Sequence, residues 1–250
     1  RWQVIRGVTA EGVLLIPNKP KACVIAIPDA DWTPEMFAGV TAELPTRLQI
    51  ARRLAQQGCL VVVPMLISRD SKFSGNPEIR MTNQPHREFL YRQSFQLGRH
   101  VIGYEIQKIL AAVDILEPYL YPQESNVTSI PIGVVGVGEG GLLAFYASAL
   151  DARIQATLIS GYFEKRNGLW KEPIYRNVWS LLTEFGDSDI ASLIAPRQLT
   201  IEACSVVNIA GPPEAVNGQV TTAAPGRIRT APIESVKNEF KIAAAHYAHL

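Results

Sequence analysis

The chain has 250 residues, of which 47% are hydrophobic and 19% are charged, a composition that suits one large folded domain and excludes a disordered chain. Lysine and arginine number 24 against 23 aspartates and glutamates, so no overall positive charge favours nucleic acid or an anionic membrane. No apolar run approaches the roughly 20 residues of a membrane-spanning helix, and the 3 widely spaced cysteines indicate neither a disulfide framework nor a zinc site.

Short apolar strands and helices alternate along the chain. In chain order we predict strand 12–16, strand 23–27, helix 46–57, strand 59–63, a polar stretch 68–85, a helical region 86–119 broken near Gly98 or Gly103, strand 131–137, helix 139–150, strand 154–159, short helices within 172–193, strand 197–203, loop 206–232 and helix 234–249. Apolar strands between helices are typical of a mainly parallel sheet covered on both faces.

We therefore expect a single α/β domain over residues 1–250. The pattern contains no repeat and no clear linker that would leave a second domain. Because the chain starts at Arg1 and stops inside a predicted helix, a fragment or one module of a longer chain is an open alternative.

The most informative segment is a glycine-rich turn between the strand over 131–137 and the helix over 139–150, where residues 132–141 are IGVVGVGEGG. This arrangement is typical of the nucleophile elbow G-x-S-x-G, in which a sharp turn after a strand exposes the nucleophile. Gly136 and Gly140 take the flanking positions, and Gly138 takes the position of the nucleophile. Glycine has no nucleophilic atom and relieves the strain of the turn, so we predict an elbow without its reactive atom.

The same glycines also satisfy a second motif. Gly136, Gly138 and Gly141 fit the dinucleotide fingerprint G-x-G-x-x-G, and Glu164 follows Gly141 at about the distance of a ribose-binding acid. However, Glu139 would place a carboxylate in the phosphate loop, where it repels pyrophosphate. A glycine turn that serves close packing alone is the third interpretation.

The order of elements resembles the α/β-hydrolase superfamily, and two segments are most similar to its dienelactone hydrolase-like and acetylxylan esterase-like members. Residues 192–197 (SLIAPR) are similar to the lead into the strand that precedes their catalytic acid, and residues 133–141 are similar to their elbow except at Gly138. The resemblance covers residues 10–205. It implies a three-layer sandwich with a mainly parallel sheet and leaves open whether the last strand is present.

The resemblance also implies a Ser-His-Asp triad, from which the chain departs. Gly138 replaces the nucleophile, and Glu202 is a loose match for the acid because it lies within the predicted strand. His246 and His249 lie in the closing helix and not on a loop after a further strand. The segment that would form the oxyanion hole carries Asp29 and Asp31, whose negative charge would oppose an oxyanion.

Four carboxylates are nevertheless the candidate catalytic residues: Glu139, Asp29, Asp31 and Glu202. Glu139 adjoins the tip of the turn, and glutamate can act as a nucleophile; its alternative role is a carboxylate favoured by the helix dipole. Asp29 and Asp31 follow a core strand, where they could do acid–base chemistry or bind Ca²⁺, or only form a turn.

Aromatic residues after the strand over 154–159 occupy the cap position of the resembling fold. We predict a ligand crevice between this cap and the elbow, lined by Gly138, Gly140, Tyr162, Trp170, Tyr175 and Trp179. A sugar or an aromatic ligand could stack there, and a packed cap core is the alternative.

Charged side chains also recur along the helical region over 86–119. They predict a partly buried network of salt bridges, made of Arg87, Arg92, Arg99, Glu88 and Glu105. A site for an acidic ligand is the less favoured interpretation.

Together these features predict a hydrolase-like protein without a recognisable triad, acting as a non-catalytic binding or scaffold domain. An ester hydrolase using an unconventional residue or parts outside this chain is one alternative, and a nucleotide-binding oxidoreductase using Gly136-x-Gly138-x-x-Gly141 is another. We expect no cofactor, no metal, no nucleic acid and no membrane span. A small-molecule or carbohydrate ligand, a neighbouring domain and a second copy of the chain are the expected partners. The compartment stays open between a bacterial-type cytoplasm and export.

Overall fold

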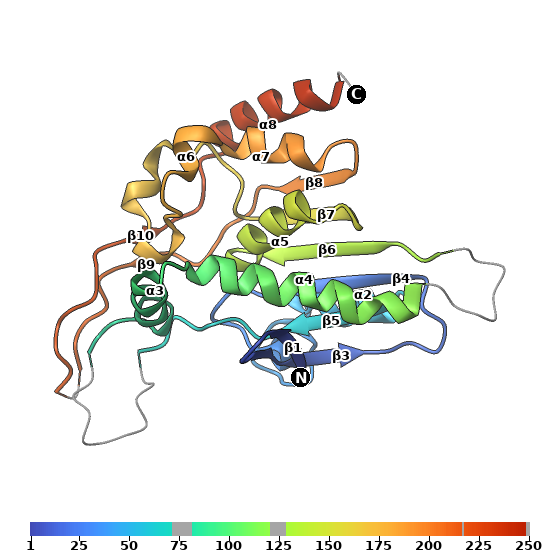
Figure 1. The fold of residues 1–250 in the computed structure, drawn as a ribbon, viewed down its shortest axis with the longest axis horizontal. Helices are drawn as coiled ribbons and strands as arrows, with labels where there is room; N and C mark the ends of the chain where they lie inside the picture. Colours follow the sequence, from blue (N-terminus) through green and yellow to red (C-terminus); the bar gives the residue numbers. More distant parts are fainter. Residues whose placement is uncertain (72–81, 121–128, 217, 249–250) are drawn as a thin grey trace.

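A computed structural model describes residues 1–71, 82–120, 129–216 and 218–248, so most of the predicted polar stretch 68–85 lies outside the described residues (Figure 1). Its centre is a sheet of six strands in the order β3-β5-β4-β6-β7-β8. The strands are β3 (Gly12–Leu15), β5 (Cys59–Pro64), β4 (Ala22–Ile27), β6 (Ile132–Val137), β7 (Ile154–Ser160) and β8 (Gln198–Glu202). Only β3 runs antiparallel to its neighbour within this sheet, which confirms the predicted fold class.

Helices cover both faces of the sheet (Figure 1). One face packs against α4 (Val101–Leu120), α5 (Glu139–Leu150) and α7 (Asp187–Ile194) in the larger core, and α8 (Ile233–Ala248) packs against α7. The other face packs against α1 (Pro34–Phe37) and α2 (Ile50–Gln56). Side chains alternate along each strand, so Ile25 of β4 enters the larger core and Val24 enters the smaller one.

The predicted helical region over 86–119 consists of two helices, as expected. The first helix, α3 (His86–Gln96), ends before Gly98, whose φ of 68° lies in the left-handed region that favours glycine after a helix. Shorter elements complete the fold: the hairpin β1 (Trp2–Ile5) and β2 (Val8–Ala10), the helices η1 (Thr46–Leu48), η2 (Arg166–Lys171), η3 (Ile174–Arg176) and α6 (Leu181–Glu184), and the strand pair β9 (Ile209–Ala210) and β10 (Arg227–Ile228).

The segment over 206–232, predicted as a loop, carries β9 and β10 and is called the strap here. It lies beside α3 near the carboxyl ends of the parallel strands (Figure 1). Asn83 Nδ2 donates to the Pro213 carbonyl, and Asn83 Oδ1 accepts from the Thr222 amide at 2.7 Å. Glu88 Oε1 accepts from the Ala224 amide at 2.8 Å. The strap is therefore tied to the start of α3.

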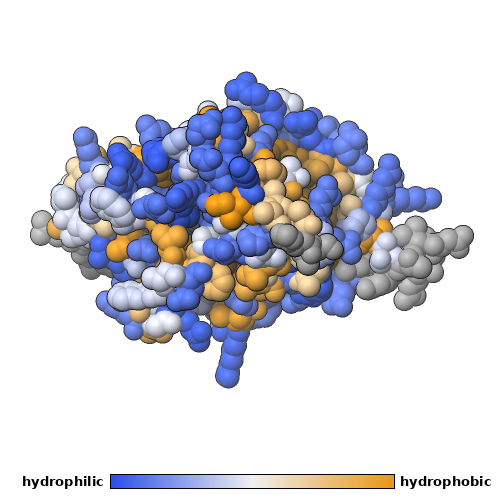
Figure 2. All heavy atoms as spheres, turned by 90° about the horizontal axis from the view of Figure 1, so that it is seen from above, coloured by the Kyte–Doolittle hydropathy of each residue, from blue (hydrophilic) through white to orange (hydrophobic). Residues whose placement is uncertain are grey.

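The surface seen from the side of α8 is mainly hydrophilic, with smaller hydrophobic areas between the polar side chains (Figure 2). Within the described part of the chain, no helix is both long enough and apolar enough to cross a membrane.

Candidate functional site

β6 and α5 are joined by a tight turn, which we call the glycine turn (136–141). Gly138 has φ 56° and ψ −112°, in the region where a side chain is strained. A Cβ on Gly136 would lie 1.9 Å from the Gly140 carbonyl oxygen, and one on Gly140 would lie 2.3 Å from the Ile27 carbonyl oxygen. Glycine is therefore required at both flanking positions, because the backbones of the turn and of β4 approach too closely for any side chain.

Asp29 lies beside the tip of this turn. It follows β4 and is buried, and its Oδ1 accepts a hydrogen bond from the Glu139 amide at 2.8 Å. The Asp29 carboxylate thus caps the N-terminus of α5. A Cβ built on Gly138 would lie 2.5 Å from Asp29 Oδ1 and 3.0 Å from its Cγ. The space that a side chain at position 138 would need is occupied.

Arg69, which follows β5, holds Asp29 in place. Its Nη1 donates to Asp29 Oδ2 at 2.8 Å and its Nη2 donates to Asp29 Oδ1 at 2.9 Å, the two-pronged geometry for which guanidinium and carboxylate are suited. The same guanidinium donates to Asp31 at 2.8 Å and to Glu139 at 3.0 Å. Because the Arg69 side chain is only 7% exposed, these pairs are poorly screened by solvent.

Glu139 is the point at which three arginines meet. Its Oε1 accepts from Arg87 at 3.3 Å, and its Oε2 accepts from Arg69 and from Arg176 Nε, each at 3.0 Å. Burial alone would raise the pKa of the Glu139 carboxyl, but Arg176, Arg87 and Arg69 together outweigh burial and hold this pKa well below its usual range. Glu139 is therefore a buried, ionised carboxylate whose two oxygens are both engaged.

These contacts continue into an ion-pair network. Arg87 pairs with Glu105 at 2.7 Å, and Glu172 accepts from both Arg176 and Arg166 at 2.9 Å. The network consists of Asp29, Asp31, Arg69, Arg87, Glu105, Glu139, Arg166, Glu172, Arg176 and Asp187. None of its members is serine, cysteine or histidine, so the network contains neither the usual nucleophiles nor the usual general base.

Glu202 lies outside this network, at the end of β8. Its Oε2 accepts from Ser160 Oγ at 2.5 Å, and Cys204 Sγ lies 3.1 Å from the same hydroxyl. His100 Nε2 contacts the Asn177 carbonyl oxygen at 3.1 Å, and His246 belongs to α8. His249 is outside the described residues. The three atoms nearest to a Cβ at position 138 all belong to Asp29.

A sequence profile of the Dienelactone hydrolase family matches residues 10–174. The chain belongs to this family. The "Putative hydrolase YtaP" of Bacillus subtilis (strain 168) is 31% identical over 114 residues, which make up 43% of this chain and 36% of that relative. The aligned part thus spans little more than a third of that protein's length.

Two solved structures share the fold of this dienelactone hydrolase-family chain. A structure described as "a putative acetyl xylan esterase" from Bacteroides fragilis is 16% identical with a TM-score of 0.65, covering 99% of this chain and 61% of that one. The glucuronoyl esterase from Solibacter usitatus is 14% identical with a TM-score of 0.52, covering 94% and 64%. At such low identity the likeness shows the α/β-hydrolase fold and nothing finer.

The predicted aromatic crevice is not formed as one cluster in this dienelactone hydrolase-family fold. Tyr162 and Tyr175 are buried, with Arg166 over the Tyr162 ring at 3.7 Å and Arg87 over the Tyr175 ring at 5.1 Å. Trp170 and Trp179 are 74% and 79% exposed, and Trp179 stacks on Phe95 of α3 instead. The tyrosine rings pack against guanidinium groups, so the network takes the room that a stacking ligand would need beside them.

The predicted salt bridges along α3 and α4 are partly present. Arg87 pairs with Glu105, and Arg92 pairs with Glu88 at 2.7 Å. Arg99 is exposed and joins no ion pair with the residues that the structure describes.

Sequence reasoning missed five members of the network: Arg69, Arg166, Glu172, Arg176 and Asp187. Of these, Arg69 and Arg176 contact Glu139 directly. Arg69 belongs to an irregular segment after β5, and Arg176 ends the three-residue helix η3. Neither segment has a period that would assign its side chain to a face. The one signal available was the position of Arg69 just beyond a core strand, at the edge of the sheet where α/β folds place functional groups.

Proposed function

We propose that this chain is a non-catalytic member of the dienelactone hydrolase family, a binding or scaffold domain built on a hydrolase fold. The observation that carries the proposal is the state of position 138. Glycine stands where the elbow would hold its nucleophile, and the Asp29 carboxylate takes the space of any side chain there. The ion-pair network fills the surroundings of the turn with charges that satisfy one another. The two hydrophobic cores lie on opposite faces of the same central sheet, which supports treating residues 1–250 as a single domain.

An ester hydrolase that uses Glu139 as its nucleophile is the competing enzyme function. Both Glu139 oxygens accept hydrogen bonds from arginines, and the side chain is fully buried. A carboxylate stabilised in this way is a weak nucleophile, because attack would require it to give up two or three charge-assisted hydrogen bonds. These contacts therefore favour the non-catalytic proposal.

A nucleotide-binding oxidoreductase is disfavoured by the same turn. In that function a pyrophosphate binds the N-terminus of the helix after the turn. Here the Glu139 amide at that N-terminus donates to Asp29, so a carboxylate already takes the place of the anion. Membership in the dienelactone hydrolase family also argues against a nucleotide-binding oxidoreductase.

Incubation with a fluorophosphonate probe, followed by intact-mass spectrometry, tests for an activated serine anywhere in the chain. We expect the mass of the folded protein to stay unchanged, because position 138 offers no hydroxyl. A stoichiometric adduct would overturn the proposal. The variant Ser160→Ala then serves as the control, because the backbone carbonyl of Ser160 accepts from the Gly138 amide at 2.9 Å and so places this serine beside the turn. Loss of the adduct in this variant would identify Ser160 as the nucleophile.

A further inference from the structure

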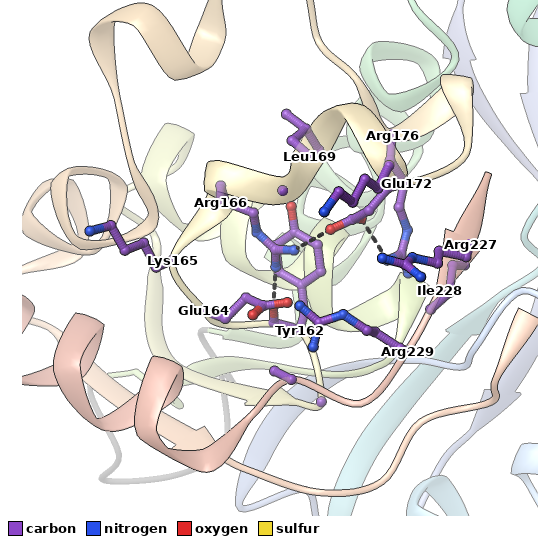
Figure 3. A pocket seen from close by; sticks show the side chains of 14 residues that line it. Tyr162, Glu164, Lys165, Arg166, Leu169, Glu172, Arg176, Arg227, Ile228 and Arg229 are labelled. Carbon is purple, nitrogen blue, oxygen red and sulfur yellow. Dashed lines mark hydrogen bonds and ion pairs between the residues drawn. The ribbon is translucent and has the colours of Figure 1, made fainter. Parts of the chain in front are cut away.

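A second feature lies beside the ion-pair network, where a small hollow separates the η2–η3 segment from the strap. It has a volume of about 80 Å³, several times what one water molecule requires. Six basic side chains line it, Lys165, Arg166, Lys171, Arg176, Arg227 and Arg229, against the two acidic side chains Glu164 and Glu172 (Figure 3). The lining is therefore strongly positive, although the whole chain is almost neutral.

Two of these arginines are already neutralised. Arg166 and Arg176 are buried and share the Glu172 carboxylate, which accepts from each at 2.9 Å (Figure 3). Arg166 also pairs with Asp187 at 3.1 Å, and Arg176 pairs with Glu139 at 2.9 Å. They form the fixed wall of the hollow, and their charge belongs to the network.

The two arginines of the strap are not neutralised. Among the described residues, no carboxylate forms an ion pair with Arg227 or Arg229, and Arg229 makes only a long hydrogen bond of 3.5 Å to the Thr230 carbonyl oxygen. Glu164, the carboxylate of the lining that is not part of the network, accepts instead from Ser235 Oγ at 3.3 Å. The strap thus brings two unpaired guanidinium groups to the hollow.

Their position is set by the packing of the strap. Ile228 lies between the two arginines and is buried, and extended backbone places alternate side chains on the same side. Gly226 approaches the start of η3 so closely that a Cβ on it would lie 2.6 Å from the Pro173 Cα. Its carbonyl accepts from the Gly211 amide at 2.7 Å. The arginines therefore project from a well-anchored segment.

We propose that this hollow binds the phosphate group of a small anionic ligand. A phosphate monoester carries roughly two negative charges near neutral pH, so it matches two unpaired guanidinium groups better than a single carboxylate does. The planar guanidinium donates two parallel hydrogen bonds to such oxygens, which gives the site a directional contact as well as charge. The proposal deepens the proposed function by naming a ligand class for the binding domain.

Isothermal titration calorimetry of the folded chain with inorganic phosphate tests this site, with glycerol 3-phosphate as a second arm and sodium acetate at equal ionic strength as the carboxylate arm. We expect phosphate or its ester to bind, acetate to bind at least about tenfold more weakly, and Arg227→Gln/Arg229→Gln to weaken phosphate binding at least about tenfold. The relative affinity of the first two arms tells free phosphate from a phosphorylated molecule as the preferred ligand.

The matched control is Arg6→Gln/Arg99→Gln, which removes the same charge from two exposed arginines that line a different hollow. It should leave phosphate binding unchanged. Equal phosphate affinity in the wild-type chain and in Arg227→Gln/Arg229→Gln, equal affinity for acetate and phosphate, or no phosphate binding at all would overturn the proposal.

Should the double variant fail to fold, hydrogen exchange of the wild-type chain decides: phosphate should slow exchange within 162–172 and 226–231. This binding test fails or succeeds independently of fluorophosphonate labelling, which reports on catalysis alone.

Discussion

Replacing Glu139 with glutamine should lower the free energy of unfolding by about 3–5 kcal/mol, the usual cost of removing one partner from a buried ion pair. The reason is the convergence of Arg69, Arg87 and Arg176 on this carboxylate. Glutamine keeps the size of the side chain, but it removes the charge and turns one acceptor into a donor that faces guanidinium donors. Denaturant unfolding followed by circular dichroism measures the change. The dependence of the unfolding free energy on denaturant concentration should be compared between the variants.

The control for this experiment is Glu234→Gln. Glu234 also forms an ion pair, with Lys237 at 3.0 Å, but both side chains are largely exposed. Exposed pairs contribute little to stability, so the unfolding midpoint of the control should not move measurably. If Glu139→Gln left the midpoint as unchanged as the control does, the network would not be what holds the glycine turn and its neighbours together.

The second large effect is expected from Gly138→Ser, which restores the residue type of an active elbow. We expect a less stable protein with no gain in ester hydrolysis. A side chain at φ 56° costs about 1–3 kcal/mol by itself. In addition, its Cβ would meet Asp29 Oδ1 at 2.5 Å, and Asp29 cannot retreat without breaking its contacts with Arg69 and the Glu139 amide. Denaturant unfolding and an ester assay measure the two parts of the prediction.

Two further variants isolate the cause of that loss. Gly103→Ser makes the same chemical change within α4, where a Cβ would meet no atom within 4 Å, and it should not destabilise the chain. Combining Gly138→Ser with Asp29→Ala removes the clash, so the combined loss should be smaller than the sum of the two single losses. Additive losses, or a large gain in ester hydrolysis by Gly138→Ser, would show that Asp29 does not block position 138.

Much of the fold could be predicted from sequence because its central elements carry strong local patterns. β4, β5 and β6 are uninterrupted apolar runs, and a glycine marks the break between α3 and α4. The pairs β1–β2 and β9–β10 were missed because strands of two to four residues are too short to show an alternation. β1 packs against α4, and Gly226, just before β10, approaches Pro173 at the start of η3; no local sequence window contains these distant partners.

The candidate site, like the fold, could be predicted from the sequence only in part. The glycine turn was visible because a run of closely spaced glycines after a strand has few structural explanations. The partners of Glu139 were not visible, because Arg69 and Arg176 are 70 and 37 residues away and lie in irregular or very short segments. Only the three-dimensional fold shows that Asp29, predicted as a possible acid or calcium ligand, faces Arg69. Three of the four candidate catalytic carboxylates, Asp29, Asp31 and Glu139, are therefore members of one group of ion pairs through Arg69.

The most direct test of the central claim is the rate of p-nitrophenyl acetate hydrolysis by the purified wild-type chain as the ester concentration rises. A non-catalytic domain should give only a slow rate that increases linearly with ester and matches that of the same protein after denaturation. Saturable hydrolysis that disappears on denaturation would contradict the account and would show that this fold still holds a working active site.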